Sequence, residues 1–469
     1  MKQNQSSYLA LITIIIVGFM LLSLKLGWLN IFFYGAEINP SVQGIDYFAV
    51  PKSFLNLLEG RSIFDTWGGA SYGPHSTWYL AHPAFSLFIA SWFSFFSPWL
   101  SYWLFILFSV GILTYCGYLI SKTTTNKLKK SSSYFFLLCA FPVYWMLFVG
   151  NMHAPLVLAL TLILISVFEL SYSEDAKDIK IANNKLFAGI LISLFTKPIV
   201  LLMLPLLLLT KETRKTIIKS LIVYVIVSLL FILLPILNPQ GVGLDKLMNV
   251  VFDFDFIKDK MNIYKNQFVL NEYMKDNSIH WLNIIAQSEY KFMHIDVFSL
   301  PVFIDTIKVL SPGVYKIPIY ICLLLSICVI FIEDKTLRLE STLLLIMAIS
   351  LSFFLSYNTV WEYQFTSVLP IIALLPILKD KGVFYKKYIS LLIAAGVFLY
   401  LPSLYFLFRG GNFDNTALTF IRLDRIIPVL ILFLIMIFQV IRAVIKHAQF
   451  KYFNKAGISE KSVENFFFK

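Results

Sequence analysis

The chain has 469 residues, of which 58% are hydrophobic and 14% are charged, whereas soluble domains carry roughly 25% charged residues. With a mean hydropathy of +0.76, the composition excludes a soluble enzyme and indicates an integral, multi-pass protein of the cell membrane. The net charge of +12 does not call for a nucleic-acid partner, because the basic residues form short clusters between apolar runs, as cytoplasmic loops do.

Apolar runs long enough to cross a bilayer of about 30 Å recur along the chain, and we expect an all-α bundle of about 11–13 transmembrane helices. The clear candidates are residues 8–24, 99–121, 133–149, 154–171, 218–236, 315–332, 339–355, 388–408 and 426–443. Shorter or interrupted candidates are residues 79–97, 186–209 and 365–378. The first run ends without a small-residue cleavage site, which favours a retained anchor over a removed signal peptide.

The basic clusters predict which loops face the cytoplasm. They lie at residues 122–130, 211–219, 379–387 and 442–446. On this basis residues 1–446 form one membrane domain with two sizeable extracytoplasmic loops, 26–78 and 237–314, followed by a short cytoplasmic tail at 447–469. One conflict arises: if 79–97 and 99–121 both cross, residues 122–130 fall outside, so either one run is re-entrant or this loop breaks the rule.

Asp46 lies in the stretch GIDYFAVPK (44–52), shortly after the first span. An amphipathic run with Pro51 near its start and Gly60 at its end predicts a short helix along the membrane surface. A carboxylate held there beside apolar walls would have a raised pKa, as a general base requires. The alternative is that Asp46 only caps the helix.

Two of the six histidines, His75 and His82, fall at the expected membrane entrance. They are candidates for donating hydrogen bonds to a phosphate or a sugar, or else for simple interfacial packing. His153 lies in a further polar break, residues 150–155, which begins Gly150-Asn151.

Thr196-Lys197-Pro198 interrupts the run 186–209 at its middle. An ammonium and a broken backbone at membrane depth are tolerated where protein or a water-filled cavity surrounds them. We therefore expect two half-helices with Lys197 pointing into a cavity, where a lipid phosphate would be its counter-ion. The alternative partner is a structural carboxylate such as Glu362, which otherwise would orient a substrate hydroxyl.

The remaining candidate metal ligands are weak. Asp253-Phe254-Asp255 has the spacing of metal-binding transferases, but so short a pattern is common by chance. The four cysteines, Cys116, Cys139, Cys322 and Cys328, lie in apolar segments without metal-ligand spacing, which indicates packing. We expect no metal and no other cofactor.

The order of these elements resembles the DUF2029 group of GT-C glycosyltransferases, which use polyprenyl-phosphomannose. The resemblance covers most of residues 8–380 and rests on Asp46, Leu57-Leu58-Glu59-Gly60, Gly150-Asn151, Lys197-Pro198 and Trp361-Glu362-Tyr363-Gln364. The start of the next span, Tyr79-Leu80-Ala81-His82-Pro83, departs from the pattern at Ala81 and His82. Gln364 stands where the late motif often has histidine, and His75, His82 or His153 would compensate.

The resemblance implies an inverting transfer of a sugar, with mannose first, from a polyprenyl-phosphate donor to a lipid or glycan hydroxyl on the extracytoplasmic side. Asp46 would be the catalytic base, and Lys197, His82 and His153 would bind the donor phosphate. Substrate binding is implied for Tyr47, His75, Asn151, Glu362 and Gln364. The expected partners are thus the lipid-phosphate sugar donor, the acceptor and membrane lipids.

Two other functions are compatible with broken helices and intramembrane charge. A transporter or flippase of lipid-linked saccharides would be expected to show paired interrupted segments in two halves, and the sequence has none. An O-antigen ligase or polymerase would be expected to carry key Arg and His residues in a late outer loop, whereas residues 409–425 contain no histidine.

Overall fold

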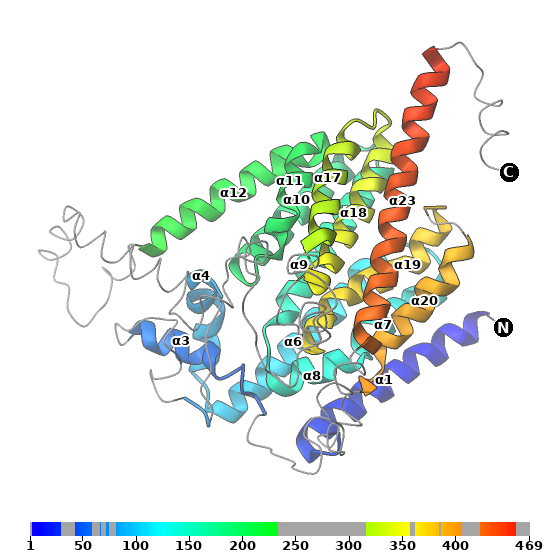
Figure 1. The fold of residues 1–469 in the computed structure, drawn as a ribbon. Helices are drawn as coiled ribbons and strands as arrows, with labels where there is room; N and C mark the ends of the chain where they lie inside the picture. Colours follow the sequence, from blue (N-terminus) through cyan, green and yellow to red (C-terminus); the bar gives the residue numbers. More distant parts are fainter. Residues whose placement is uncertain are drawn as a thin grey trace, which may run out of the picture.

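The computed structural model describes residues 2–29, 43–58, 66, 72–74, 81–232, 316–356, 362–383, 386–404 and 423–455. Within these ranges the regular elements are all helices, which confirms the all-α polytopic fold (Figure 1). The expected outer loop 237–314, with Asp253 and Asp255, and parts of the first outer loop, with His75, lie outside the described residues.

Five helices of the described part are long and apolar enough to cross a membrane. They are α1 (Lys2–Leu26), α6 (Pro98–Ser121), α9 (His153–Tyr172), α18 (Lys335–Ser356) and α23 (Leu423–Lys455). A sixth crossing results if α7 (Lys127–Leu138) and α8 (Phe141–Val149) count as one span. The expected 11–13 helices concern the whole chain and stay a prediction; within the described residues several apolar runs form shorter or broken helices.

The run 133–149, expected as one span, is bent by 43° between α7 and α8. Pro142 lies in the first turn of α8. Proline has no N–H to continue the α7 hydrogen-bond ladder and its ring crowds the preceding turn, so the helix must break there. The bend brings the C-terminal end of α8 into the interior of the protein, where Phe148 and Val149 are buried.

The run 79–97 does not form a full span in the described residues. Its helical part consists of α4 (Pro83–Phe85), the π-helix η2 (Ser86–Ala90) and α5 (Ser91–Ser94). These twelve residues extend about 18 Å, short of the bilayer core. They pack against the amphipathic helix α3 (Ala49–Leu58). This arrangement agrees with the re-entrant alternative, in which residues 122–130 would face the cytoplasm.

The chain breaks at Thr196-Lys197-Pro198, as the sequence predicts. Helix α10 (Ala176–Phe195) ends there, and the 3-10 helix η3 (Ile199–Leu202) and the short α11 (Leu204–Leu209) follow. A residue before proline is disfavoured in the helical region, so Lys197 leaves the helix axis. The next helix, α12 (Lys211–Ile232), then begins a new direction.

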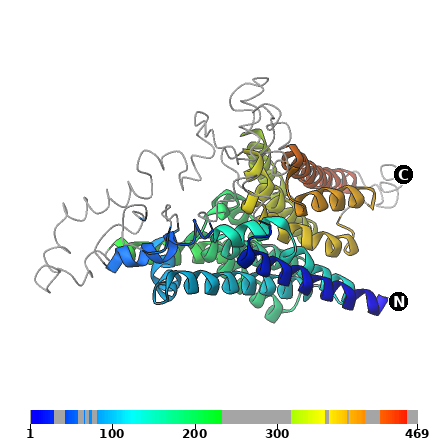
Figure 2. The same cartoon turned by 90° about the horizontal axis from the view of Figure 1, so that it is seen from below.

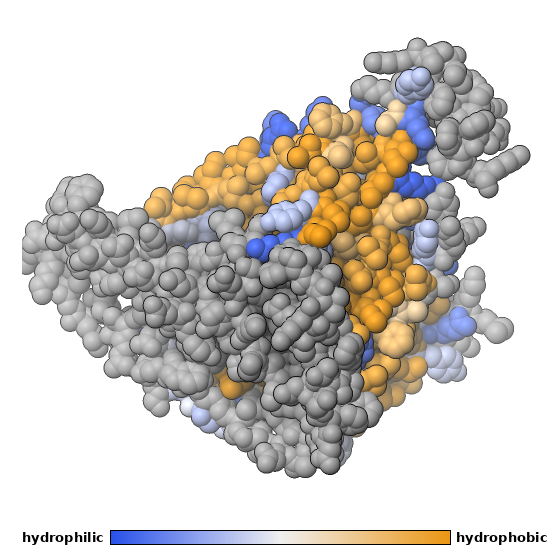
Figure 3. Space-filling view, viewed as in Figure 1, coloured by the Kyte–Doolittle hydropathy of each residue, from blue (hydrophilic) through white to orange (hydrophobic). Residues whose placement is uncertain are grey.

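Four further elements complete the bundle. They are α17 (Ile317–Ile330), the 3-10 helix η6 (Glu362–Val368), α19 (Leu369–Asp380) and α20 (Lys386–Tyr400). Helices α9 and α18 are almost entirely enclosed, whereas α1 is mostly exposed. Figure 3 shows apolar side chains over α12, α17 and α23. The exposed apolar residues of these helices include Ile222, Leu324 and Leu434. Such a surface fits contact with lipid, in agreement with an integral membrane protein.

The basic ends of several helices meet on one side of the bundle. Figure 2 shows the start of α1 and the far end of α23 on this side, and α3 on the opposite side. Ser6 of α1 donates a hydrogen bond to the carbonyl of Lys127 (3.1 Å), which places the start of α7 there as well. Helix α23 continues to Lys455, so residues 447–455 of the expected tail prolong this helix.

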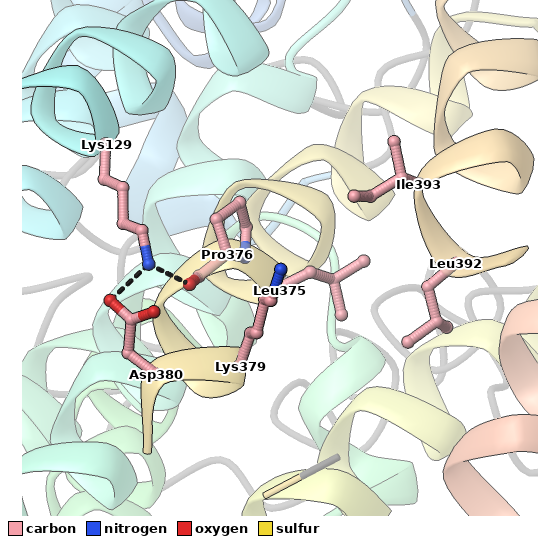
Figure 4. A pocket seen from close by; sticks show the side chains of 7 residues that line it. All are labelled: Lys129, Leu375, Pro376, Lys379, Asp380, Leu392 and Ile393. Carbon is pink, nitrogen blue, oxygen red and sulfur yellow. Dashed lines mark hydrogen bonds and ion pairs between the residues drawn. The ribbon is translucent and has the colours of Figure 1, made fainter. Parts of the chain in front are cut away.

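Lys129 joins α7 to the end of α19 on the basic side. Its ammonium donates to the carbonyl of Pro376 (2.7 Å) and pairs with Asp380. A cavity of about 270 Å³ lies beside this pair (Figure 4). It is lined by Lys129, Leu375, Pro376, Lys379, Asp380, Leu392 and Ile393. The cavity is thus at the opposite end of the α7–α8 pair from the polar break that follows α8.

Candidate functional site

The loop that carries Asp46 is attached to the C-terminal end of α8 by main-chain hydrogen bonds. The N–H of Gly44 donates to the carbonyl of Phe148 (2.8 Å), and the N–H of Asp46 donates to the carbonyl of Val149 (2.9 Å). The last carbonyls of a helix lack partners within the helix, so the loop satisfies them. The backbone itself therefore places Asp46 at the end of α8.

Gly150 makes this close approach possible. It ends α8 in the left-handed conformation, with φ +70°, which glycine adopts without steric cost. A Cβ atom at this position would lie 2.4 Å from the Cβ of Tyr47, well inside van der Waals contact. The chain turns at Gly150 and directs the next residue, Asn151, toward Asp46.

The side-chain amide of Asn151 joins the carboxylate to the cation. Its Nδ2 donates a hydrogen bond to Oδ2 of Asp46 (2.7 Å). Its Oδ1 accepts a hydrogen bond from Nζ of Lys197 (3.2 Å). Three polar breaks that are far apart in the sequence, at residues 46, 151 and 197, therefore form one site.

His153 completes the environment of Lys197. Its Nδ1 lies 2.9 Å from Nζ of Lys197 and 2.7 Å from Oδ1 of Asn151. An ammonium has only donors to offer and an amide oxygen only accepts, so a protonated Lys197 donates to Oδ1 of Asn151, and a proton on Nδ1 of His153 makes the 2.7 Å contact with the same oxygen a hydrogen bond. His153 is buried at the first position of α9, and the cation thus has two fixed neutral neighbours.

Tyr363 covers the cation from a fourth segment, η6. Nζ of Lys197 lies 5.5 Å from the centre of the Tyr363 ring, within the range of cation–π attraction. The same ring contacts His153, with 5.1 Å between ring centres and 66° between planes. No sequence signal distinguishes Tyr363 from its neighbours in the Trp361-Glu362-Tyr363-Gln364 motif.

The surroundings of Asp46 alter its acidity. Burial raises the pKa of the Asp46 carboxyl, and the hydrogen bond from Asn151 and the positive charge of Lys197 act in the opposite direction. The net direction is upward. A carboxylate with a raised pKa is a stronger base, and it remains ionised only if the pH lies above that value.

The structure does not bring His82 into this cluster. Its Nε2 lies 2.9 Å from Oγ of Ser228 in α12, and its Nδ1 accepts a hydrogen bond from the N–H of Ala84 (3.0 Å). The main-chain N–H of His82 also donates to the carbonyl of Phe195, at the end of α10. His82 thus links α4 to α10 and α12, and both of its ring nitrogens are engaged in that role.

Three predicted substrate-binding residues are also engaged in packing. The Tyr47 hydroxyl pairs with Ser101 inside a cluster of aromatic rings. Glu362 pairs with Arg425 rather than with Lys197, which it was expected to approach as an alternative. Gln364 is buried within η6, and His75 lies outside the described residues.

Within the described ranges no three His, Cys, Asp or Glu side chains are grouped so that they could hold a metal ion. All four cysteines are free thiols. The chemistry of the cluster is therefore that of one carboxylate, one ammonium, one amide and one imidazole. Together these groups can accept a proton and bind an anion.

The comparisons with known proteins agree with this chemistry. The model of glycosyltransferase family 87 matches residues 79–272 of the chain. This match supports a membrane glycosyltransferase of the GT-C type, and thus a sugar donor and an acceptor as substrates. The matched range contains Asn151, His153 and Lys197, while Asp46 and Tyr363 lie outside it. No curated protein and no solved structure matches the chain.

Proposed function

We propose that the protein transfers a sugar from a polyprenyl-phosphate donor to a hydroxyl of a lipid or glycan acceptor, with inversion at the anomeric carbon. The observation that carries this proposal is the Asn151 amide, which holds Asp46 on its nitrogen and Lys197 on its oxygen. Transfer from a phosphate requires a base for the acceptor and a cation for the leaving group. The site offers one of each, at a fixed spacing.

In this mechanism Asp46 accepts the proton of the acceptor hydroxyl as the oxygen attacks the anomeric carbon. The bond from that carbon to the phosphate oxygen breaks, and its electron pair leaves with the polyprenyl phosphate. The phosphate passes from one negative charge to two, and the Lys197 ammonium stabilises the added charge. His153, whose Nδ1 lies 2.9 Å from Nζ of Lys197, is a second candidate to contact the same phosphate.

Two further observations support the proposed class of donor and the proposed sugar. One ammonium with neighbouring donors suits the single phosphate of a polyprenyl-phosphate sugar, and a lipid donor reaches the site through the bilayer. The sequence resemblance to polyprenyl-phosphomannose-dependent enzymes favours mannose. Neither support depends on a metal or another cofactor.

The distribution of basic residues supports a proposal for the side of the membrane on which the site lies. The basic residues of α7, beginning at Lys127, lie at one end of the α7–α8 pair, and Asn151 follows the other end. Because basic ends face the cytoplasm, we propose that the site opens on the extracytoplasmic side.

The test is sugar transfer by the purified protein in lipid vesicles. Labelled polyprenyl-phosphate mannose and an extract of membrane lipids and glycans are supplied, and the anomeric configuration of the product is determined. We expect labelled product with the configuration opposite to that of the donor. A product of unchanged configuration would refute the inverting mechanism. Absence of transfer from every lipid-phosphate sugar tested would refute the proposed reaction and favour transport of a lipid-linked saccharide.

A further inference from the structure

A fully buried ion pair lies next to the ring that covers Lys197. Arg425, in the first turn of α23, pairs with both carboxylate oxygens of Glu362, the first residue of η6. Each residue is only 1% exposed. The Nε–Oε2 distance is 3.0 Å, and the geometry is the bidentate one that gives an Arg–carboxylate pair its directionality.

Two of the three remaining donors of Arg425 are used by main-chain carbonyls. Nη1 donates to Phe398 (2.6 Å), and Nη2 donates to Leu401 as well as to Glu362. These bonds connect three segments: η6, the end of α20 and the start of α23. A guanidinium with four of its five donors occupied is poorly placed to bind substrate, so the pair acts on the position of these segments.

A buried ion pair contributes little net stability to the contact between helices. Removing two charges from water costs free energy that their attraction often does not recover, and apolar replacements of similar volume are frequently as stable. What the pair supplies in addition is direction, because a bidentate contact fixes both the position and the rotation of η6. The residue after Glu362 is Tyr363, whose ring lies 5.5 Å from Nζ of Lys197.

We propose that Arg425 and Glu362 are positioning residues that hold Tyr363 against Lys197 and His153, and thereby aim the ammonium at the leaving phosphate. This inference rests on the proposed function of Lys197. It assigns a role to Tyr363, which acts through the cation, and to Arg425, which lies on a helix that contributes no other group to the site.

The first experiment separates positioning from stability. Arg425→Met leaves Glu362 buried without its charged partner and should lower Tm strongly. Glu362→Leu/Arg425→Met removes both charges and should regain most of the lost Tm. We expect kcat of the double variant to stay about tenfold below wild type although its Tm recovers. A tenfold loss corresponds to the cation–π contact between Tyr363 and Lys197. Recovery of kcat together with Tm would overturn the proposal, because a merely structural pair predicts that result.

The matched control is another ion pair of the bundle, which is only partly buried. Arg338 of α18 pairs with Glu212 of α12, with 2.5 Å between Nη2 and Oε1, and also donates to the Ile332 carbonyl. Glu212→Leu/Arg338→Met should leave kcat within twofold of wild type. An equal loss of kcat in the control would show that any removed ion pair slows the enzyme, and would overturn the assignment.

The second experiment tests whether Arg425 acts through Tyr363. Tyr363→Leu should lower kcat about tenfold with little change in KM. Added to Glu362→Leu/Arg425→Met, it should cause no further loss, because both changes remove the same contact. Losses that multiply would place the two effects on independent steps and contradict the proposal.

A third measurement does not require transfer. A 3-fluorotyrosine introduced at position 363 gives a ¹⁹F signal that senses the neighbouring cation. We expect Lys197→Met to shift this signal, and Glu362→Leu/Arg425→Met to shift or broaden it, while the Glu212/Arg338 control leaves it unchanged. An unchanged signal in the Glu362/Arg425 variant would refute the positioning role even if the transferase activity stands. A shifted signal in a protein without transfer would refute only the proposed reaction.

If the double variant does not fold, Glu362→Gln, which keeps the side-chain volume, takes its place in all three experiments.

Discussion

Nδ2 of Asn151 lies 2.7 Å from Oδ2 of Asp46, although the two residues are 105 positions apart in the chain. The contact exists because the main chain of the Asp46 loop closes the end of α8, and Gly150 turns the next residue back toward that loop. The orientation of the proposed base is thus set by backbone geometry before any substrate binds.

Asn151→Asp should place a second carboxyl beside Asp46. Two neighbouring carboxylates repel, so the pKa of one of them rises strongly. We expect the acid limb of kcat/KM to move to higher pH and the maximal rate to fall at least tenfold. A pH profile of the variant checks this, with Asn183→Asp on α10 as the control. An unmoved acid limb would mean that Asp46 is not the titrating group.

The wild-type enzyme should lose activity as the pH is lowered. The pKa of Asp46 is raised above the ordinary carboxyl value of about 3.9, and only the ionised form accepts a proton. Therefore kcat/KM should fall tenfold per pH unit below this raised pKa and level off above it. The measurement is the pH dependence of kcat/KM in vesicles, for wild type and Asp46→Asn. The acid limb should be absent from the residual activity of the variant.

Lys197→Gln should slow the chemical step more than it weakens donor binding. The ammonium stabilises charge that grows as the phosphate leaves, so we expect kcat to fall by about 10²–10³ with a smaller change in KM. Lys185→Gln, which removes a lysine of α10 that pairs with Glu169 of α9, is the control. A pure KM effect would assign Lys197 to ground-state binding.

Gly150→Ala should disrupt the site through the backbone. The added methyl would lie 2.4 Å from the Cβ of Tyr47, at a φ of +70° that alanine disfavours. We expect a loss of several kcal/mol in stability or a displaced Asp46 loop, seen as a lower Tm and lower activity. Gly111→Ala in α6 is the matched control, because nothing lies within 4 Å of its Cβ position, and a helical Gly→Ala change stabilises by up to about 1 kcal/mol.

The sequence predicted the class of the fold and four members of the cluster, because the relevant signals are local. Apolar runs identify membrane helices, and the four members are polar groups in otherwise apolar surroundings: Asp46, Asn151, His153 and Lys197. The Lys197-Pro198 pair also predicted that the helix ends there, because proline restricts the backbone of the residue before it. These features need no knowledge of which segments meet.

What the sequence could not supply is the pairing between distant segments. The sequence alone does not distinguish His82 from His153 as a candidate phosphate ligand. The difference arises from the packing of α4 on α10 and α12, which engages both ring nitrogens of His82. Glu362 looks like a partner for Lys197 until α23 brings Arg425 to it. The course of each apolar run is a related case, because such a run has the same composition whether it crosses, bends after Leu138 or returns.

The most direct measurement for the central claim is the transfer rate of Asp46→Asn relative to wild type. Asparagine keeps the size of the side chain and removes the base, while Asp175→Asn makes the same change at the exposed cap of α10. With normal folding and membrane insertion, Asp46→Asn should lose at least about a hundredfold in kcat, and Asp175→Asn should match wild type. Equal rates for Asp46→Asn and wild type would contradict the assignment of Asp46 as the base.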